Sequence, residues 1–80
     1  MKIKLLLFGI TSDLLGTSSL VIEIQENSTV TTLKSILVKK YPQLKNIDSY
    51  AIAINEEYAS EETQINPNDV VAIIPPVSGG

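Results

Sequence analysis

The residues with the clearest chemical potential are the last six, Pro75-Pro76-Val77-Ser78-Gly79-Gly80. The sequence contains four glycines, and two of them end it. The proline pair predicts a stiff, extended start, and glycines lack the Cβ that would block a narrow channel. Six extended residues span about 20 Å. We therefore predict a flexible tail, residues 75–80, that carries the α-carboxylate of Gly80 into another protein's active site. The plainer alternative is a frayed terminus.

Other catalytic groups are scarce in this sequence. It has no cysteine, which excludes a thiolate nucleophile, a disulfide and a thiolate metal site, and no histidine, the usual general base and transition-metal ligand. Ser78 therefore has no histidine to activate it. Asp13 has no carboxylate neighbour at a useful spacing for a paired-acid site. We expect that the chain binds no metal or cofactor and that a partner supplies the bases and electrophilic groups.

The charge and the hydropathy exclude two classes of partner. The net charge is −3 and all six basic residues are lysines, which disfavours nucleic acids and anionic membranes. The longest apolar run, Val70–Ile74, is far shorter than the roughly 20 residues of a membrane span, and Leu5–Phe8 is too short for a signal peptide. We expect a cytoplasmic protein. The acidic segment 56–62 is interpreted as a solvated loop. The alternative is that its negative charge attracts a basic partner protein.

One small domain must position the tail, because 80 residues fill only one core. Alternating or continuous apolar runs predict strands at Lys2–Phe8, Ser19–Ile24, Tyr50–Ile54 and Val70–Ile74, with a short edge strand starting at Tyr58. Helical spacing predicts a helix over Val30–Tyr41, capped by Ser28 or Thr29 and stopped by Pro42. The remaining segments are predicted as a loop at Gly9–Gly16, a connector at Gln43–Asp48 and turns at Asn55–Glu57 and Asn66–Asp69.

This order of elements is that of a β-grasp, or ubiquitin-like, domain of the α+β class. It predicts a mixed sheet of four to five strands with one main helix packed across it, over residues 1–74. The continuously apolar last strand is expected at the centre of the sheet.

A second candidate surface is the sheet face turned away from the helix. In the first strand, Leu6 and Phe8 alternate with residues that should pack under the helix. If Val71 and Ile73 point toward the helix in the last strand, its other positions extend an apolar patch. The predicted partner interface consists of Leu6, Phe8, Ala53, Ala72 and Ile74, because contiguous apolar patches are typical of docking surfaces. The alternative for Leu6 and Phe8 is ordinary burial.

The stretch Val71-Ala72-Ile73-Ile74-Pro75-Pro76-Val77-Ser78-Gly79-Gly80 resembles the C-terminal signature of the small subunit of molybdopterin synthase, a ubiquitin-like sulfur carrier. Asn55 after an apolar strand and Thr29-Val30 with Leu33 at the helix start are also similar to that family. The sequence departs from it at Ser12-Asp13, where members often carry Arg-Glu.

The resemblance implies a defined chemistry for the tail. A ubiquitin-activating-type enzyme would use ATP to adenylate Gly80, and the acyl-adenylate would become a thiocarboxylate. The tail, with Gly79 as a slim spacer, would then enter the large subunit of a heterotetramer. There the sulfur would pass to a pyranopterin precursor in molybdenum cofactor biosynthesis. The chain would be a non-catalytic subunit of this sulfurtransferase, with the active residues in the large subunit.

Three alternatives stay open from the sequence. The chain could be a thiamin-pathway sulfur carrier, which shares the Gly-Gly end but generally lacks the approach Pro75-Pro76-Val77-Ser78. It could be a ubiquitin-like modifier that is conjugated to lysines through the same activated Gly80. The third alternative is a β-grasp binding module without tail chemistry.

Overall fold

The computed structural model describes residues 1–46 and 50–75. Over these ranges the chain forms one sheet in the strand order β2-β1-β5-β3-β4. The strands are β1 (Lys2–Leu7), β2 (Ser19–Glu23), β3 (Ala51–Ile54), β4 (Glu57–Tyr58) and β5 (Val70–Ile74). The helices are α1 (Ile10–Leu15), α2 (Val30–Lys40) and the 3₁₀ helix η1 (Pro42–Asn46). Within residues 1–46 and 50–75, no helix is long and apolar enough to cross a membrane.

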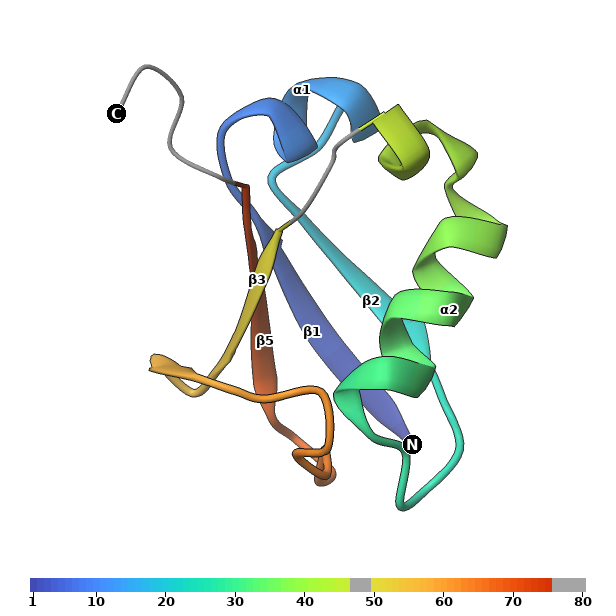
Figure 1. The fold of residues 1–80 in the computed structure, drawn as a ribbon, viewed down its shortest axis with the longest axis vertical. Coiled ribbons are helices and arrows are strands. Elements are labelled where there is room, and N and C mark those ends of the chain that lie inside the picture. The colour runs from blue at the N-terminus through green and yellow to red at the C-terminus, as the bar shows by residue number, and fades with distance from the viewer. Residues whose placement is uncertain (47–49, 76–80) are drawn as a thin grey trace.

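The neighbouring strands β1 and β5 run parallel, and all other pairs of neighbouring strands in the sheet are antiparallel. Figure 1 shows α2 lying across one face of the sheet. This arrangement confirms the predicted β-grasp fold, a mixed sheet packed under one main helix. The continuously apolar β5 is third in the order of five strands, which is the central position expected for it.

The hydrophobic core lies between α2 and the face of the sheet that the alternation in β1 predicted. The buried side chains of β1, α2 and β5 are Ile3, Leu5, Leu7, Val30, Leu33, Leu37, Val71 and Ile73. Burying each such side chain stabilises the fold by about 1.5–3 kcal/mol. Because successive residues of a strand face opposite ways, Ala72 and Ile74 lie on the outer face, as predicted.

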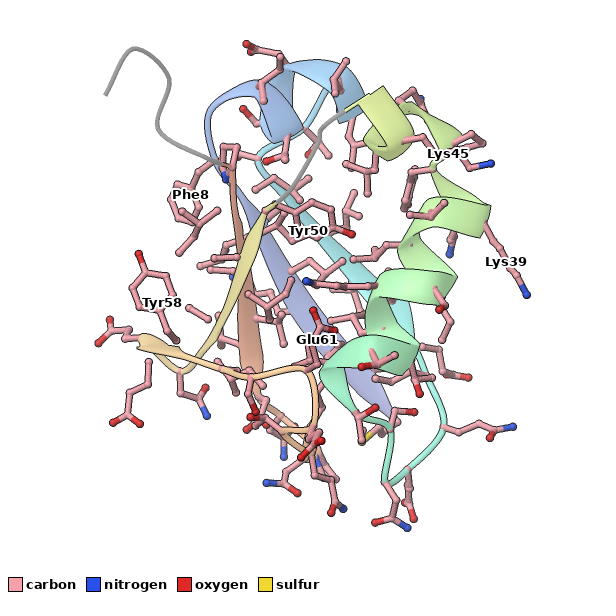
Figure 2. All side chains as sticks on the ribbon, in the orientation of Figure 1. Phe8, Lys39, Lys45, Tyr50, Tyr58 and Glu61 are labelled. Carbon is pink, nitrogen blue, oxygen red and sulfur yellow. The ribbon has the colours of Figure 1, made fainter. Side chains whose placement is uncertain are left out.

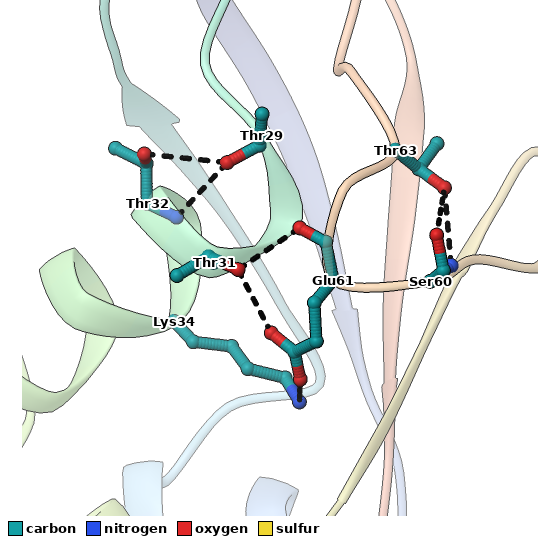
Figure 3. A network of polar contacts seen from close by, with 7 residues as sticks. All are labelled: Thr29, Thr31, Thr32, Lys34, Ser60, Glu61 and Thr63. Carbon is teal, nitrogen blue, oxygen red and sulfur yellow. Dashed lines mark hydrogen bonds and ion pairs between the residues drawn. The ribbon is translucent and has the colours of Figure 1, made fainter.

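The first amides of α2 are hydrogen-bonded from two sides. The hydroxyl of Thr29 accepts from the Thr32 N–H at 3.4 Å (Figure 3), so of the two predicted caps the threonine is the one used. The N–H groups of Val30 and Thr31 donate to carbonyls in the segment 61–63 at 3.0 and 3.1 Å. These bonds satisfy donors that a helix start otherwise leaves unpaired, and they tie α2 to the chain that follows β4.

The end of α2 falls one residue before the predicted one. The helix stops at Lys40, and Tyr41 follows as its C-cap with φ −128° and ψ 80°. The cause is Pro42, because a residue that precedes proline is pushed away from helical geometry.

The segment Gly9–Gly16 was predicted as a loop, and this prediction was wrong, because it contains helix α1. The glycines bracket the helix instead of continuing a loop. Gly16 has φ 72° and forms a left-handed C-cap whose N–H donates to the Ser12 carbonyl at 2.9 Å. Polar residues such as Thr11, Ser12 and Asp13 are common in turns, but hydroxyl and carboxylate side chains suit the first turn of a helix equally well.

Several other boundaries differ by one residue or in type. The 3₁₀ helix η1 occupies most of the connector predicted at Gln43–Asp48, the last part of which lies outside the described residues. β1 and β2 end before Phe8 and Ile24, one residue earlier than predicted, and β3 starts one residue later, at Ala51. The predicted turn after β3 is shorter, because Glu57 already pairs in β4.

Candidate functional site

An open groove runs over the outer face of the sheet, on the side away from α2. Its lining residues are Leu6, Phe8, Ala53, Asn55, Glu56, Tyr58, Val70, Ala72 and Ile74. All five residues of the predicted interface are therefore brought together on one surface. Their role in binding a partner stays a prediction.

The strand register explains why these residues meet. Leu6 lies opposite Ala72, Ala72 lies opposite Ala53, and Ala53 lies opposite Tyr58. One row of side chains thus crosses four strands on the outer face. The two alanines in the middle of the row have short side chains and form the bottom of the groove. Tyr58, which is 76% exposed, lies at the β4 end of the row.

Aromatic side chains flank the groove. Phe8 is 50% exposed, and Figure 2 shows Phe8 and Tyr58 projecting from the sheet on the side away from α2. Large exposed apolar side chains gathered around a groove are typical of a docking surface, and aromatic residues are the usual anchors of such surfaces.

Four lining residues were not predicted from the sequence: Asn55, Glu56, Tyr58 and Val70. Val70 could have been found, because it shares the parity of Ala72 and Ile74 in β5. Tyr58 depended on the hairpin register, which the sequence left open. Asn55 and Glu56 occupy a turn with φ 51° and 73°, and no periodicity locates turn residues on a face.

A hydrogen-bonded link between side chains holds one end of the groove. The Asn55 amide donates from Nδ2 to Asp69 Oδ1 at 2.9 Å, and its Oδ1 accepts from the Val70 N–H at 3.0 Å. The second oxygen of Asp69 accepts from the Asn66 N–H at 2.8 Å. Asp69 is only 8% exposed. These bonds fasten the β3–β4 turn to the turn before β5, and so fix Val70 and Glu56 at the groove.

The other end of the groove leads to the tail. Ile74 ends β5 and lines the groove, and the next residue, Pro75, lies half-buried against the junction between β1 and α1. A Cβ added to Gly9 would stand 3.1 Å from Pro75 Cγ. The other predicted tail residues are Pro76, Val77, Ser78, Gly79 and Gly80, and they lie outside the described residues.

The predicted acidic segment divides between two environments. Glu56 lines the groove, whereas Glu61 faces α2 and forms an ion pair with Lys34, with Nζ 2.7 Å from Oε1 (Figure 3). The Thr31 hydroxyl donates to Glu61 Oε2 at 3.1 Å. The hydrogen bond from Lys34, followed by that from Thr31, lowers the pKa of Glu61. Its side chain therefore serves the fold, although it is exposed like the other glutamates of the segment.

Lys34 also lies over an aromatic ring. Its Nζ is 5.2 Å from the centroid of Tyr50, a distance at which a cation and a ring attract each other. Burial, with a smaller contribution from the charge of Glu61, raises the pKa of Tyr50 above its ordinary range. The phenol therefore stays protonated at neutral pH. Among residues 1–46 and 50–75, no group of His, Cys, Asp and Glu side chains could hold a metal ion.

Comparison with known proteins gives a consistent set of relatives. The model of the ThiS family matches residues 5–80. The molybdopterin synthase sulfur carrier subunit of Arabidopsis thaliana is 38% identical over 80 residues, which cover 99% of this chain and 83% of that protein.

Two solved structures extend the comparison. Subunit 1 and subunit 2 of the molybdopterin-converting factor from Helicobacter pylori form a protein–protein complex. The matching chain of that complex is 26% identical over the full length of both chains, with a TM-score of 0.71. The small archaeal modifier protein 1 from Methanosarcina acetivorans is 28% identical, with a TM-score of 0.80, over 99% of this chain and 96% of that one.

Proposed function

The chain belongs to the ThiS family, and on that premise we propose how it works as a sulfur carrier in molybdenum cofactor biosynthesis. The carboxylate of Gly80 is activated, converted to a thiocarboxylate and presented to a pyranopterin precursor inside a large subunit. The observation that supports this proposal is the continuity of groove and tail. Ile74 lines the groove and Pro75 follows it, so a partner that docks on the outer face stands beside the start of the tail.

The proposed chemistry has an activation step and a transfer step. In the first, a carboxylate oxygen of Gly80 attacks the α-phosphorus of ATP on the activating enzyme, and pyrophosphate leaves. A hydrosulfide-level donor then attacks the carbonyl carbon, the new C–S bond replaces the bond to AMP, and a proton is released. A carboxylate cannot be thiolated directly because oxide is too poor a leaving group.

In the transfer step, the thiocarboxylate sulfur forms a bond to a carbon of the pterin precursor and displaces an oxygen substituent, which leaves that carbon with the bonding electron pair. Water then cleaves the acyl C–S bond, which leaves the sulfur on the pterin and returns the carboxylate of Gly80. The large subunit supplies the groups that assist these steps. The carrier supplies the sulfur and brings it into place.

The groove residues hold the carrier on its partner while the tail reacts. Phe8 and Tyr58 offer aromatic surface that a partner pocket could enclose, and Leu6, Ala53, Ala72 and Ile74 form an apolar floor between them. The pairing of subunit 1 with subunit 2 in the Helicobacter pylori complex supports a large subunit as this partner.

The test is a reconstitution with purified components. The carrier is prepared with a C-terminal thiocarboxylate and mixed with the large subunit and the cyclic pterin precursor, and dithiolene formation is followed. We expect sulfur to appear on the pterin and the carrier to return to the carboxylate mass. A control that lacks Gly79 and Gly80 should fold normally but transfer nothing. Transfer by this truncated control would contradict the proposal.

A second candidate function has one observation in its favour, the likeness to the small archaeal modifier protein 1. A modifier would use the same activated Gly80 with a lysine amine as the acceptor. Intact-mass measurement of the chain from cells separates the two functions. A thiocarboxylate replaces one oxygen by one sulfur, whereas conjugation gives branched adducts in which Gly80 is joined to a lysine.

A further inference from the structure

The junction between β1 and α1 packs against the base of the tail. This junction comprises Phe8, Gly9, Ile10 and Thr11, and Figure 1 shows the start of α1 beside the end of β5. The ring of Pro75, which follows β5, lies beside Gly9, since a Cβ added there would stand 3.1 Å from Pro75 Cγ. Pro75 is the first residue of the proposed tail, so this junction lies directly beside the point where the tail begins.

Thr11 fixes the peptide groups around Phe8. Its side chain is fully buried, and its hydroxyl donates to the Phe8 carbonyl at 2.5 Å and accepts from the Phe8 N–H at 3.1 Å. The Thr11 backbone N–H donates to the same carbonyl at 3.1 Å. One buried hydroxyl therefore restrains both polar groups of Phe8, and a buried hydroxyl with two partners is costly to remove.

Gly9 has two separate reasons to lack a side chain. Its backbone has φ 54° and ψ −132°, a conformation that glycine adopts at low cost and other residues do not. A Cβ would also lie 3.1 Å from the ring of Pro75. The Gly9 carbonyl accepts from the Ser12 hydroxyl at 2.9 Å and from the Ser12 N–H at 3.2 Å, so the first turn of α1 holds the glycine in place.

We propose that this junction is a seat for Pro75 that orients the tail for sulfur transfer. In this role Gly9 and Thr11 are positioning residues, which act through Pro75 and do not touch the pterin. Gly9 leaves room for the ring, and Thr11 holds the junction in the conformation that creates that room. The inference rests on the proposed function and adds residues that act on the same transfer.

The geometry of a tethered reactive group explains why a seat matters. A chain of five residues spans about 16 Å when fully extended, and a tilt of about 20° at the base of such a chain moves its end by about 6 Å. A reacting pair must approach to about 3–3.5 Å. A base that is already oriented reduces the ordering cost that docking would otherwise carry. Phe8 belongs to both the groove and the junction, so a partner docked on the groove stands in a fixed relation to Pro75.

The test compares single-turnover sulfur transfer by carriers that are prepared with a C-terminal thiocarboxylate, over a range of large-subunit concentrations. We expect Gly9→Ala and Thr11→Val to lower the maximal rate by about tenfold or more, with the half-saturating concentration within about threefold of wild type. Thr11→Ser keeps the hydroxyl and should restore most of the rate. Gly16→Ala is the control, since Gly16 also has a positive φ of 72° but nothing within 4 Å of an added Cβ.

A double-mutant cycle isolates the contact with the ring. Pro75→Ala removes Cγ, so Gly9→Ala should cost markedly less in that background than in wild type. This cycle does not depend on the strain that Gly9→Ala introduces, because that strain is present in both backgrounds. Pro75→Ala alone changes a residue outside the strands and should lower the maximal rate without unfolding the domain.

The outcomes distinguish the seat from the proposed function. If the wild-type thiocarboxylate transfers no sulfur, the proposed function is wrong. If wild type transfers and Thr11→Val and Pro75→Ala match its maximal rate, the seat is wrong and the function stands. An effect confined to the half-saturating concentration, or equal costs of Gly9→Ala in both backgrounds, would also overturn the seat.

Discussion

Asn55 donates a hydrogen bond to the nearly buried carboxylate of Asp69 across 14 positions of the sequence, at 2.9 Å. The same amide accepts from the Val70 N–H at 3.0 Å. One side chain thereby joins the β3–β4 turn to the start of the central strand β5. The link explains how a turn with two residues at positive φ is held at the groove without glycine.

Replacing Asn55 by glycine should destabilise the domain although glycine suits the positive φ. The change removes one hydrogen bond from the nearly buried Asp69 carboxylate, which costs about 1–3 kcal/mol. The Val70 N–H is exposed and can bond to water instead. Asn68→Gly is the matched control, because Asn68 also has a positive φ, of 70°, and lies in the exposed turn before β5. Urea denaturation measures both. A loss no larger for Asn55→Gly than for Asn68→Gly would show that the link contributes no stability.

Phe8→Ala should weaken binding to the large subunit more than it weakens the fold. Phe8 is 50% exposed in the free domain, so its removal should cost clearly less than the about 3–5 kcal/mol of a buried phenylalanine. As an aromatic anchor it should contribute about 2 kcal/mol or more to binding. Calorimetric titration and thermal unfolding of the same variant give the two values.

Val21→Ala is the control for that experiment. Val21 is 64% exposed on the edge strand β2 and does not line the groove. Its replacement should leave the affinity unchanged. Equal losses of affinity for both variants would show that the groove is not the docking surface. A large loss of stability for Phe8→Ala with unchanged affinity would make Phe8 a core residue instead.

The ion pair between Glu61 and Lys34 should give a small, pH-dependent contribution to stability. Its bonds lower the pKa of Glu61 below the ordinary value of 4.5. The contribution is therefore present above about that pH and is lost as the pH falls through the lower pKa of the folded state. Urea midpoints of wild type and Glu61→Gln should differ at pH 7 and converge at lower pH. The pair is exposed, so added salt should also reduce the difference.

Lys34→Met removes the same pair from the other side and should show the same trend with pH. If the difference between wild type and Glu61→Gln stays constant down to the acid-unfolding range, the ion pair does not set the pKa of Glu61. The double variant should then lose no less than the sum of the single variants, whereas a real pair makes the losses less than additive.

Strand parity made most of the fold and the outer face predictable. The alternation of Ile3, Leu5 and Leu7 with Leu6 in β1 placed the helix on one face and the apolar patch on the other, because side chains alternate strictly along a strand. The central place of β5 followed from its unbroken apolar run. These patterns are local in the sequence, so they can be recognised without any knowledge of the tertiary structure.

The features that sequence reasoning missed depend on contacts between distant segments. Pro75 and Gly9 lie side by side but are far apart in the sequence. Nothing about a glycine or a proline in the sequence predicts that these two residues meet. The loop prediction over Gly9–Gly16 treated glycine as a loop signal, although glycine at positive φ also flanks short helices. The link from Asn55 to Asp69 likewise needs the β3–β5 register, which no local pattern supplies.

The final prediction concerns Gly79 and Gly80, the two terminal residues of the tail, which have no side chain. Gly79→Val keeps the terminal carboxylate but adds a branched Cβ, which restricts the backbone and widens the tail. A carrier extended by one residue after Gly80 keeps the slim tail but locks the Gly80 carboxylate in an amide. We expect both changes to abolish or severely reduce sulfur transfer while the thermal unfolding of the domain stays as in wild type.

The two variants separate channel width from chemical identity. Gly79→Val is supplied with a chemically prepared thiocarboxylate, so a failure of activation cannot hide its effect on transfer. If it then transfers sulfur at the wild-type rate, glycine at this position is not selected by a narrow channel. Ser78→Ala is the matched control, because it narrows the tail and should leave the rate unchanged. If the extended carrier transfers sulfur without being trimmed, the Gly80 carboxylate is not the reacting group, because an amide carbonyl has no carboxylate oxygen that could attack the α-phosphorus of ATP.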